Sequence, residues 1–112
     1  MVATYVPRAG DIVWLDFDAP GREQAKRRPA LVVTDASYNR ASGLAIVCPL
    51  TSRRKPYPFA LPIVVDKVDG PVLVDHVKSL DWVARKAKLH SKADAELLSK
   101  VRSYLGVLLA IQ

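Results

Sequence analysis

The chain has 112 residues, of which 50% are hydrophobic and 25% are charged. This length is enough for one domain with its own core, and the composition excludes a largely disordered chain. We therefore expect residues 1–112 to form a single domain. Seventeen Lys and Arg residues against eleven Asp and Glu residues give a net charge of +6, which favours a polyanionic partner such as a nucleic acid.

Membrane, secreted and metal-binding classes are not expected. No apolar run approaches the roughly 20 residues that span a bilayer, and the first residues do not have the pattern of a signal peptide. The only cysteine, Cys48, lies in an apolar run and is typical of a buried thiol in a reducing cytosol. We expect a cytoplasmic protein without a membrane partner. Because the only histidines are His76 and His90 and the acids are scattered, we expect no metal and no cofactor.

Short apolar runs separated by turn residues dominate the first three quarters of the chain. Their alternation and β-branched content predict strands at 11–18, 30–35, 44–51, 58–66 and 71–77. The pair Asp69-Gly70 is a hairpin signal between the last two runs. Strands of this length and spacing are typical of a small barrel or a sandwich.

The end of the chain has a helical pattern instead. Residues 91–110 repeat apolar side chains at helical spacing, which predicts one amphipathic helix with Lys100 and Arg102 left to solvent. Ser91 followed by Asp94 is a weak signal for its start, and residues 79–84 are expected to form a short helical turn. The predicted fold is mainly β with a C-terminal helix (α+β), arranged as a small β-barrel that the helix covers.

The cations fall in three sets, near the ends of predicted strands and around residues 79–84. The sets are Arg22, Lys26, Arg27 and Arg28; Arg53, Arg54 and Lys55; and Lys78, Arg85, Lys86 and Lys88. Loops that are distant in sequence meet at one end of a small barrel, so the sets could form one basic groove. The aromatic residues Tyr57, Phe59 and Trp82 lie near the second and third sets and could stack on bases. The alternative is a set of solvated loops with Phe59 and Trp82 in the core.

Arg28 is the cation with the best-defined position. Because it precedes Pro29, its backbone is held in an extended conformation, and its guanidinium is suited to two phosphate oxygens. Thr51, at the end of a predicted strand, carries a hydroxyl that could donate to the same phosphate. Glu23 could orient Arg28 or accept a proton; the alternative is an ordinary surface ion pair between the two.

Six motifs in order resemble the MazF/PemK family of toxins from bacterial toxin–antitoxin modules. They are "GDIVWLDFD", "EQAKRRPALVV", "YN", "CPLTS", "YPF" and "DHVKSLDW". Each motif is weak alone, but six at matching spacing are specific. The resemblance implies an SH3-like barrel that forms a homodimer, cuts single-stranded RNA without a metal, and is inhibited by an antitoxin of the MazE kind.

The resemblance also assigns roles to residues. The family's catalytic positions fall on Arg28, Thr51 and Glu23, and its "DQV" aspartate falls on Asp75. Without a metal, the 2′-hydroxyl of the RNA would attack the adjacent phosphorus, and the protein would stabilise the developing charge and assist two proton transfers. We expect the RNA to be bound by Lys26, Arg27, Ser52, Arg53, Arg54, Lys55, Tyr57, Asp75 and Lys78.

Two departures from the family pattern and two other functions remain open. His76 stands where the family more often has Gln, and Leu73 stands where some members carry a cleaving Arg, which leaves the role of Asp75 undecided. The alternatives to a ribonuclease are a gyrase-poisoning toxin of the CcdB type, which shares the fold, and a single-stranded nucleic-acid binding module that cuts nothing. Exposed apolar residues near the helix end (Val107, Leu108 and Ile111) would agree with a homodimer.

Overall fold

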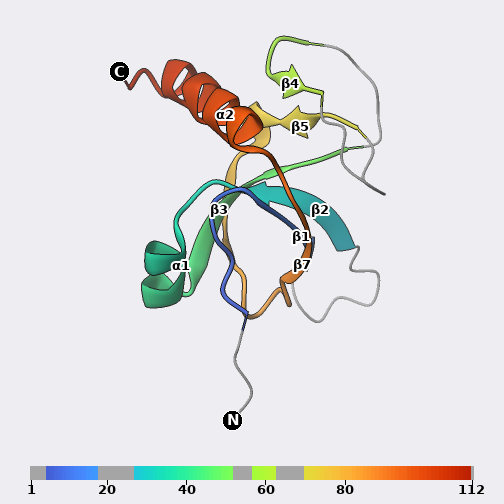
Figure 1. The fold of residues 1–112 in the computed structure, drawn as a ribbon, viewed down its shortest axis with the longest axis vertical. Coiled ribbons are helices and arrows are strands. Elements are labelled where there is room, and N and C mark those ends of the chain that lie inside the picture. Colours follow the sequence, from blue (N-terminus) through green and yellow to red (C-terminus); the bar gives the residue numbers. More distant parts are fainter. Residues whose placement is uncertain (1–4, 18–26, 52–56, 63–69, 112) are drawn as a thin grey trace.

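A five-stranded antiparallel sheet forms most of the computed structural model, which describes residues 5–17, 27–51, 57–62 and 70–111. The strand order is β6-β3-β2-β1-β7 (Figure 1). The strands are β1 (Asp11–Asp16), β2 (Arg27–Val32), β3 (Leu44–Pro49), β6 (Lys78–Asp81) and β7 (Lys88–Lys92). Each strand pairs antiparallel with its neighbours, which agrees with the mainly β prediction.

A second, two-stranded sheet and three helical elements complete the structure. The small sheet pairs β4 (Ala60–Leu61) with β5 (Val72–Leu73), and a bridge between Leu50 and Val72 joins it to the end of β3. The helical elements are α1 (Ala36–Ser42), the 3-10 helix η1 (Val74–His76) and the C-terminal helix α2 (Ala95–Leu108). Helix α2 lies with β4 and β5 on one side of the main sheet, and α1 lies apart from them beside β3 (Figure 1).

The main sheet has a separate hydrophobic core on each face, because successive side chains of a strand point to opposite faces. The first core, which includes Ile12, Leu31 and Cys48, packs beneath α2, β4 and β5. The second core contains Val13, Leu15, Ala30, Val32, Ala45, Val47, Leu80 and Trp82. A strand that buries both of its faces reads as a continuous apolar run, which explains the runs found in the sequence.

The predicted C-terminal helix is confirmed, but it starts later than its first sequence signal. The strand β7 continues to Lys92, so Asp94 rather than Ser91 caps α2, and its side chain accepts a hydrogen bond of 2.7 Å from Leu97 N. Capping satisfies one of the free amide groups at the helix start. Val101 is buried, and Leu97, Leu98, Tyr104 and Leu105 pack against the first core.

Other local predictions were wrong or missing. The helical turn expected at 79–84 is correct only in its second half: Lys78–Asp81 is a strand that buries Leu80, and a turn follows at 82–86, where Arg85 N donates a hydrogen bond of 3.0 Å to Asp81 O. Asp81 then ends this strand, since its Oδ1 accepts hydrogen bonds from Val83 N and Ala84 N. Neither the helix α1 nor the strand β7 was predicted.

The outer strands of the sheet, β6 and β7, do not pair with each other within the described part of the chain. The closed SH3-like barrel therefore stays a prediction. The mainly β fold with a C-terminal helix is confirmed by the five-stranded sheet and by α2. None of the helices among the described residues is both long and apolar enough to cross a membrane.

Candidate active site

Arg28 occupies an exposed position at the start of β2. It pairs with Leu15 across the β1–β2 ladder, so it shares a face of the sheet with the second core. Its side chain is exposed and makes no hydrogen bond or ion pair with another residue of the described segments. Pro29 follows it within the strand and fixes an extended backbone. The backbone of Arg28 is thus restrained, and no described residue occupies its guanidinium.

Thr51 lies at the end of the neighbouring strand. The β2–β3 register pairs Ala30 with Pro49, and Leu50 N donates a hydrogen bond of 3.0 Å to Pro29 O. If this register continued for one more residue beyond Leu50, Thr51 would stand opposite Arg28. The predicted partnership of these two residues is therefore compatible with the pairing of the strands that carry them.

Phe17 and Lys78 stand at the same rim of the second core. The Nζ atom of Lys78 lies 5.3 Å from the centre of the Phe17 ring, an arrangement that attracts the cation to the aromatic face. Arg85 holds the chain here by donating hydrogen bonds of 3.0 and 2.7 Å to the carbonyl oxygens of Asp16 and Phe17. We use the name rim cluster for Phe17, Arg28, Thr51 and Lys78, which strand alternation assigns to the sheet face of the second core and of which Phe17 and Lys78 contact each other.

Phe17 was not among the predicted site residues, although a sequence signal for it existed. Residues 11, 13, 15 and 17 alternate onto one face of β1 and its continuation, and Phe17 packs against the second core at the end of this series. The cluster presents two cations, a hydroxyl and an aromatic ring, which are the groups that bind a phosphate and an adjacent base.

Arg27 differs from its neighbour Arg28 because its guanidinium already has protein partners. It forms an ion pair of 3.0 Å with Asp16 and donates hydrogen bonds of 3.0 and 2.7 Å to the carbonyl oxygens of Trp14 and Lys86. These contacts fix the β1 end to the turn after β6. Arg27 therefore helps to hold the scaffold beside Arg28, and its predicted RNA contact stays a prediction.

Tyr57 and Asp75 form a second polar pair. The Tyr57 hydroxyl donates a hydrogen bond of 2.8 Å to Asp75 Oδ1. Desolvation, this hydrogen bond and the charge of Asp75 together raise the pKa of Tyr57 to about 12. Tyr57 is therefore a neutral donor at ordinary pH. Tyr57 and Asp75 do not belong to strands β2 or β3, which lead to Arg28 and Thr51. A shared role of Tyr57 and Asp75 with the rim cluster therefore stays a prediction.

The remaining predicted site residues lie outside the described residues. They are Glu23, Lys26, Ser52, Arg53, Arg54 and Lys55. Within the segments that the structure describes, no three His, Cys, Asp or Glu side chains gather in a group that could hold a metal ion.

The fold defines a class: a small, mainly β-sheet protein with a C-terminal helix, which carries exposed cations at the start of β2 and β6. Residues 8–109 match the family model of the PemK-like, MazF-like toxin of type II toxin–antitoxin systems. The chain belongs to this family.

The curated relatives that the chain matches are endoribonucleases by name. It is 39% identical to the endoribonuclease toxin MazF of Escherichia coli K12 over 110 residues, which cover 97% of this chain and 99% of that protein. It is 31% identical to the E. coli endoribonuclease PemK over 104 residues, covering 87% of this chain and 78% of PemK.

Solved structures with a similar fold include a MazE–MazF complex from Deinococcus radiodurans. The matching chain has a TM-score of 0.89 and 46% identity, with coverage of 96% of this chain and 100% of that chain. An endoribonuclease from a mycobacterial species, in complex with its cognate antitoxin, has a TM-score of 0.77 at 18% identity, which shows a shared fold. The predicted family is therefore confirmed, as is the mainly β fold with a C-terminal helix.

Proposed function

We propose that this protein is a toxin endoribonuclease that cuts single-stranded RNA, chiefly mRNA, and thereby stops translation and growth. The observation that carries the proposal is the exposed Arg28 on β2, whose side chain has no partner among the described residues, in a chain that aligns along nearly its whole length with endoribonuclease MazF. The net charge of +6 adds attraction for the RNA backbone.

The reaction that this site suits needs no metal ion. The 2′-hydroxyl of the RNA attacks the adjacent phosphorus, the bond to the 5′-oxygen of the next nucleotide breaks, and the products carry a 2′,3′-cyclic phosphate and a 5′-hydroxyl. Arg28 stabilises the negative charge that grows on the phosphoryl oxygens, and Thr51 donates a hydrogen bond to the same phosphate. Arginine remains protonated at ordinary pH and is a poor base, so Glu23 is proposed to accept the proton of the 2′-hydroxyl, and Arg28 to supply the proton that turns the leaving 5′-oxygen into a hydroxyl.

RNA on either side of the cut would follow the basic residues near the rim cluster. We propose Lys78 and Tyr57 as contacts to the RNA, with Lys26, Arg27, Ser52, Arg53, Arg54, Lys55 and Asp75 as further substrate-site positions. The proposed assembly is a homodimer of single-domain, SH3-like barrel protomers in the cytoplasm. An antitoxin of the MazE kind is the proposed inhibitor, since the similar solved structures include MazE–MazF complexes.

The test is cleavage of a long, mixed-sequence RNA in EDTA by the native protein, Arg28→Ala and Arg40→Ala. Arg40 is a matched control because it is also an exposed arginine, and its helix α1 lies on the opposite side of the molecule from the start of β2 (Figure 1). We expect discrete fragments with 5′-hydroxyl ends from the native protein and from Arg40→Ala, and none from Arg28→Ala. Intact RNA with all three proteins, despite salt-sensitive binding, would leave a binding module that does not cut.

A further inference from the structure

Trp14 is a large aromatic side chain that belongs to neither hydrophobic core. It lies on the opposite face of β1 from Leu15, is partly exposed, and is absent from both clusters of packed core residues. By contrast, Trp82 is 8% exposed, packs in the second core and donates from Nε1 to Asn39 O at 2.9 Å. Burial of Trp14 therefore does not explain why a tryptophan stands at this position.

One neighbouring ring contacts Trp14, and cationic residues occupy adjacent positions on the flanking strands. Its ring meets that of His90 edge to face, with centres 5.7 Å apart, and His90 Nδ1 lies 2.9 Å from Ser91 Oγ. Lys88 is directly opposite Trp14 on β7, and Arg27 donates to the Trp14 carbonyl oxygen. A partly open aromatic ring next to cations is the arrangement on which proteins stack the bases of single-stranded nucleic acids.

The position of Trp14 relative to Arg28 also fits a nucleic-acid contact. In the β1–β2 register Trp14 pairs with Pro29 and Leu15 pairs with Arg28, so the two side chains are one ladder step apart and on opposite faces of the same sheet end. An RNA strand that crosses this end could place its scissile phosphate at Arg28 and a flanking base at Trp14.

We propose that Trp14 is a stacking platform for an unpaired RNA base that flanks the phosphate held by Arg28. This inference rests on the proposed function, because it takes single-stranded RNA as the ligand. Stacking tolerates any base, so Trp14 strengthens RNA binding generally and has little influence on which sequence is cut.

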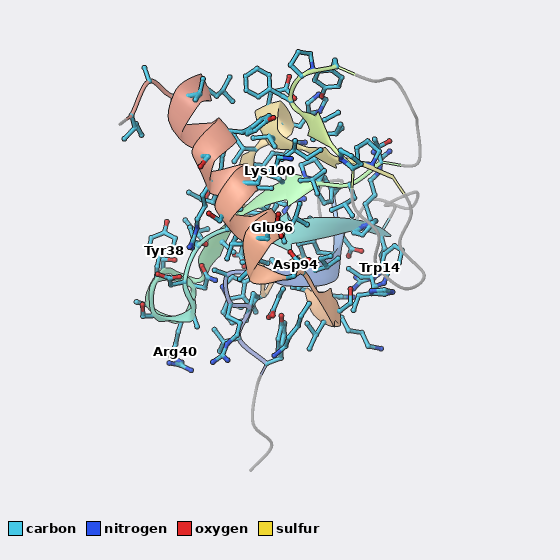
Figure 2. All side chains as sticks on the ribbon, turned by 45° about the horizontal axis from the view of Figure 1, so that its top comes forward. Trp14, Tyr38, Arg40, Asp94, Glu96 and Lys100 are labelled. Carbon is cyan, nitrogen blue, oxygen red and sulfur yellow. The ribbon has the colours of Figure 1, made fainter. Side chains whose placement is uncertain are left out.

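The test uses a single-stranded oligonucleotide of mixed sequence with 2′-O-methyl groups, which binds but cannot be cut through a 2′-hydroxyl. Binding is measured for the native protein, Trp14→Phe, Trp14→Leu and Tyr38→Leu. Phe retains an aromatic face, whereas Leu retains only apolar volume. Tyr38 is a control because it is 43% exposed on α1, at the opposite side of the molecule from Trp14 (Figure 2).

We expect Trp14→Leu to raise Kd by about 5- to 140-fold, the range for loss of one stacked base. Trp14→Phe should stay within about threefold of the native Kd, and Tyr38→Leu should leave it unchanged. In the native protein, RNA should quench the emission of Trp14, whereas the emission of Trp14→Phe, which comes from buried Trp82 alone, should not respond. Equal thermal unfolding of the variants serves as the folding control.

Three results would overturn the inference in distinguishable ways. If Trp14→Leu binds as tightly as the native protein while native RNA is still cut, only the role of Trp14 is refuted. If the oligonucleotide does not bind the native protein and RNA is not cut, the proposed function fails as well. If Trp14 is quenched by an acidic peptide but not by RNA, or responds to protein concentration alone, its surface serves a protein partner instead.

Discussion

Substitutions of the adjacent Arg27 and Arg28 should have different effects: Arg27→Ala should lower the stability of the fold, and Arg28→Ala should lower the rate of RNA cleavage. Arg27→Ala removes two hydrogen bonds to carbonyl oxygens and an ion pair with Asp16, in which the arginine side chain is 38% exposed. After a discount for solvent screening, each carbonyl bond contributes about 0.5–1 kcal/mol and the ion pair at most about 0.5 kcal/mol. The expected loss is about 1–2.5 kcal/mol, which lowers Tm by about 4–10 °C for a chain of this length.

Arg28→Ala should give the opposite pattern. Because Arg28 makes no side-chain bond within the described segments, its removal should change the free energy of unfolding by less than about 0.5 kcal/mol. Loss of one charge-stabilising group should slow cleavage by about 10²- to 10³-fold or more.

The assay combines thermal unfolding of both variants with cleavage rates at a temperature where both are folded. At saturating RNA, where a weakened substrate contact of Arg27 no longer limits the rate, Arg27→Ala should keep most of the cleavage rate constant, and Arg28→Ala should keep most of the stability. If Arg28→Ala unfolds at a much lower Tm, or if Arg27→Ala abolishes cleavage while fully folded, then the assignment of one arginine to the scaffold and the other to the phosphate is wrong.

Three further predictions concern stability and titration. Burial first, and then the hydrogen bond from its hydroxyl to the buried carboxylate of Asp11, raise the pKa of Tyr5 above its ordinary value. Its contribution to stability is therefore full below pH 10 and is lost as pH rises through the folded-state pKa, so Tyr5→Phe should remove part of the alkaline fall in stability measured by denaturant unfolding. Burial raises the pKa of the Cys48 thiol to about 12, so a thiol reagent at pH 8 should react only after unfolding; rapid reaction of the native protein would contradict the buried position. Asp94→Ala should lower stability by about 1 kcal/mol through loss of the α2 cap, whereas Asp94→Asn should retain most of it; equal losses would argue against capping.

The sequence predicted those parts of the fold that depend on local pattern. Apolar runs predicted the strands β1, β2 and β3, and a 3.6-residue apolar period predicted α2. Both patterns arise because these side chains are buried, and the structure contains all four elements. The strand β7 reads KLHSK and exposes most of its side chains, so it has no such pattern and depends on pairing with β1. The helix α1 depends on Asn39, which is buried and bonds to Pro7 and Thr34, a tertiary contact that no local pattern reveals.

The candidate site was predictable only in part for similar reasons. Pro29 and the strand it enters identified Arg28 as a fixed cation, and the structure leaves that side chain exposed. The different role of Arg27 could not be read from the sequence, because its partners include the carbonyl oxygen of Lys86, 59 residues away. The contact of Lys78 with the Phe17 ring likewise joins residues that are far apart in the sequence, so no local pattern reveals it.

The central claim is that the RNA supplies its own nucleophile while Arg28 stabilises the charge on the phosphate. The most direct test places a 2′-deoxy nucleotide at the 5′ side of a mapped cleavage site, in an otherwise identical RNA and in EDTA. The account predicts that this single change stops cleavage at that site, although the RNA still binds, and that the unmodified RNA yields a 2′,3′-cyclic phosphate. Cleavage of the 2′-deoxy substrate at the same site would contradict it and would require a different nucleophile.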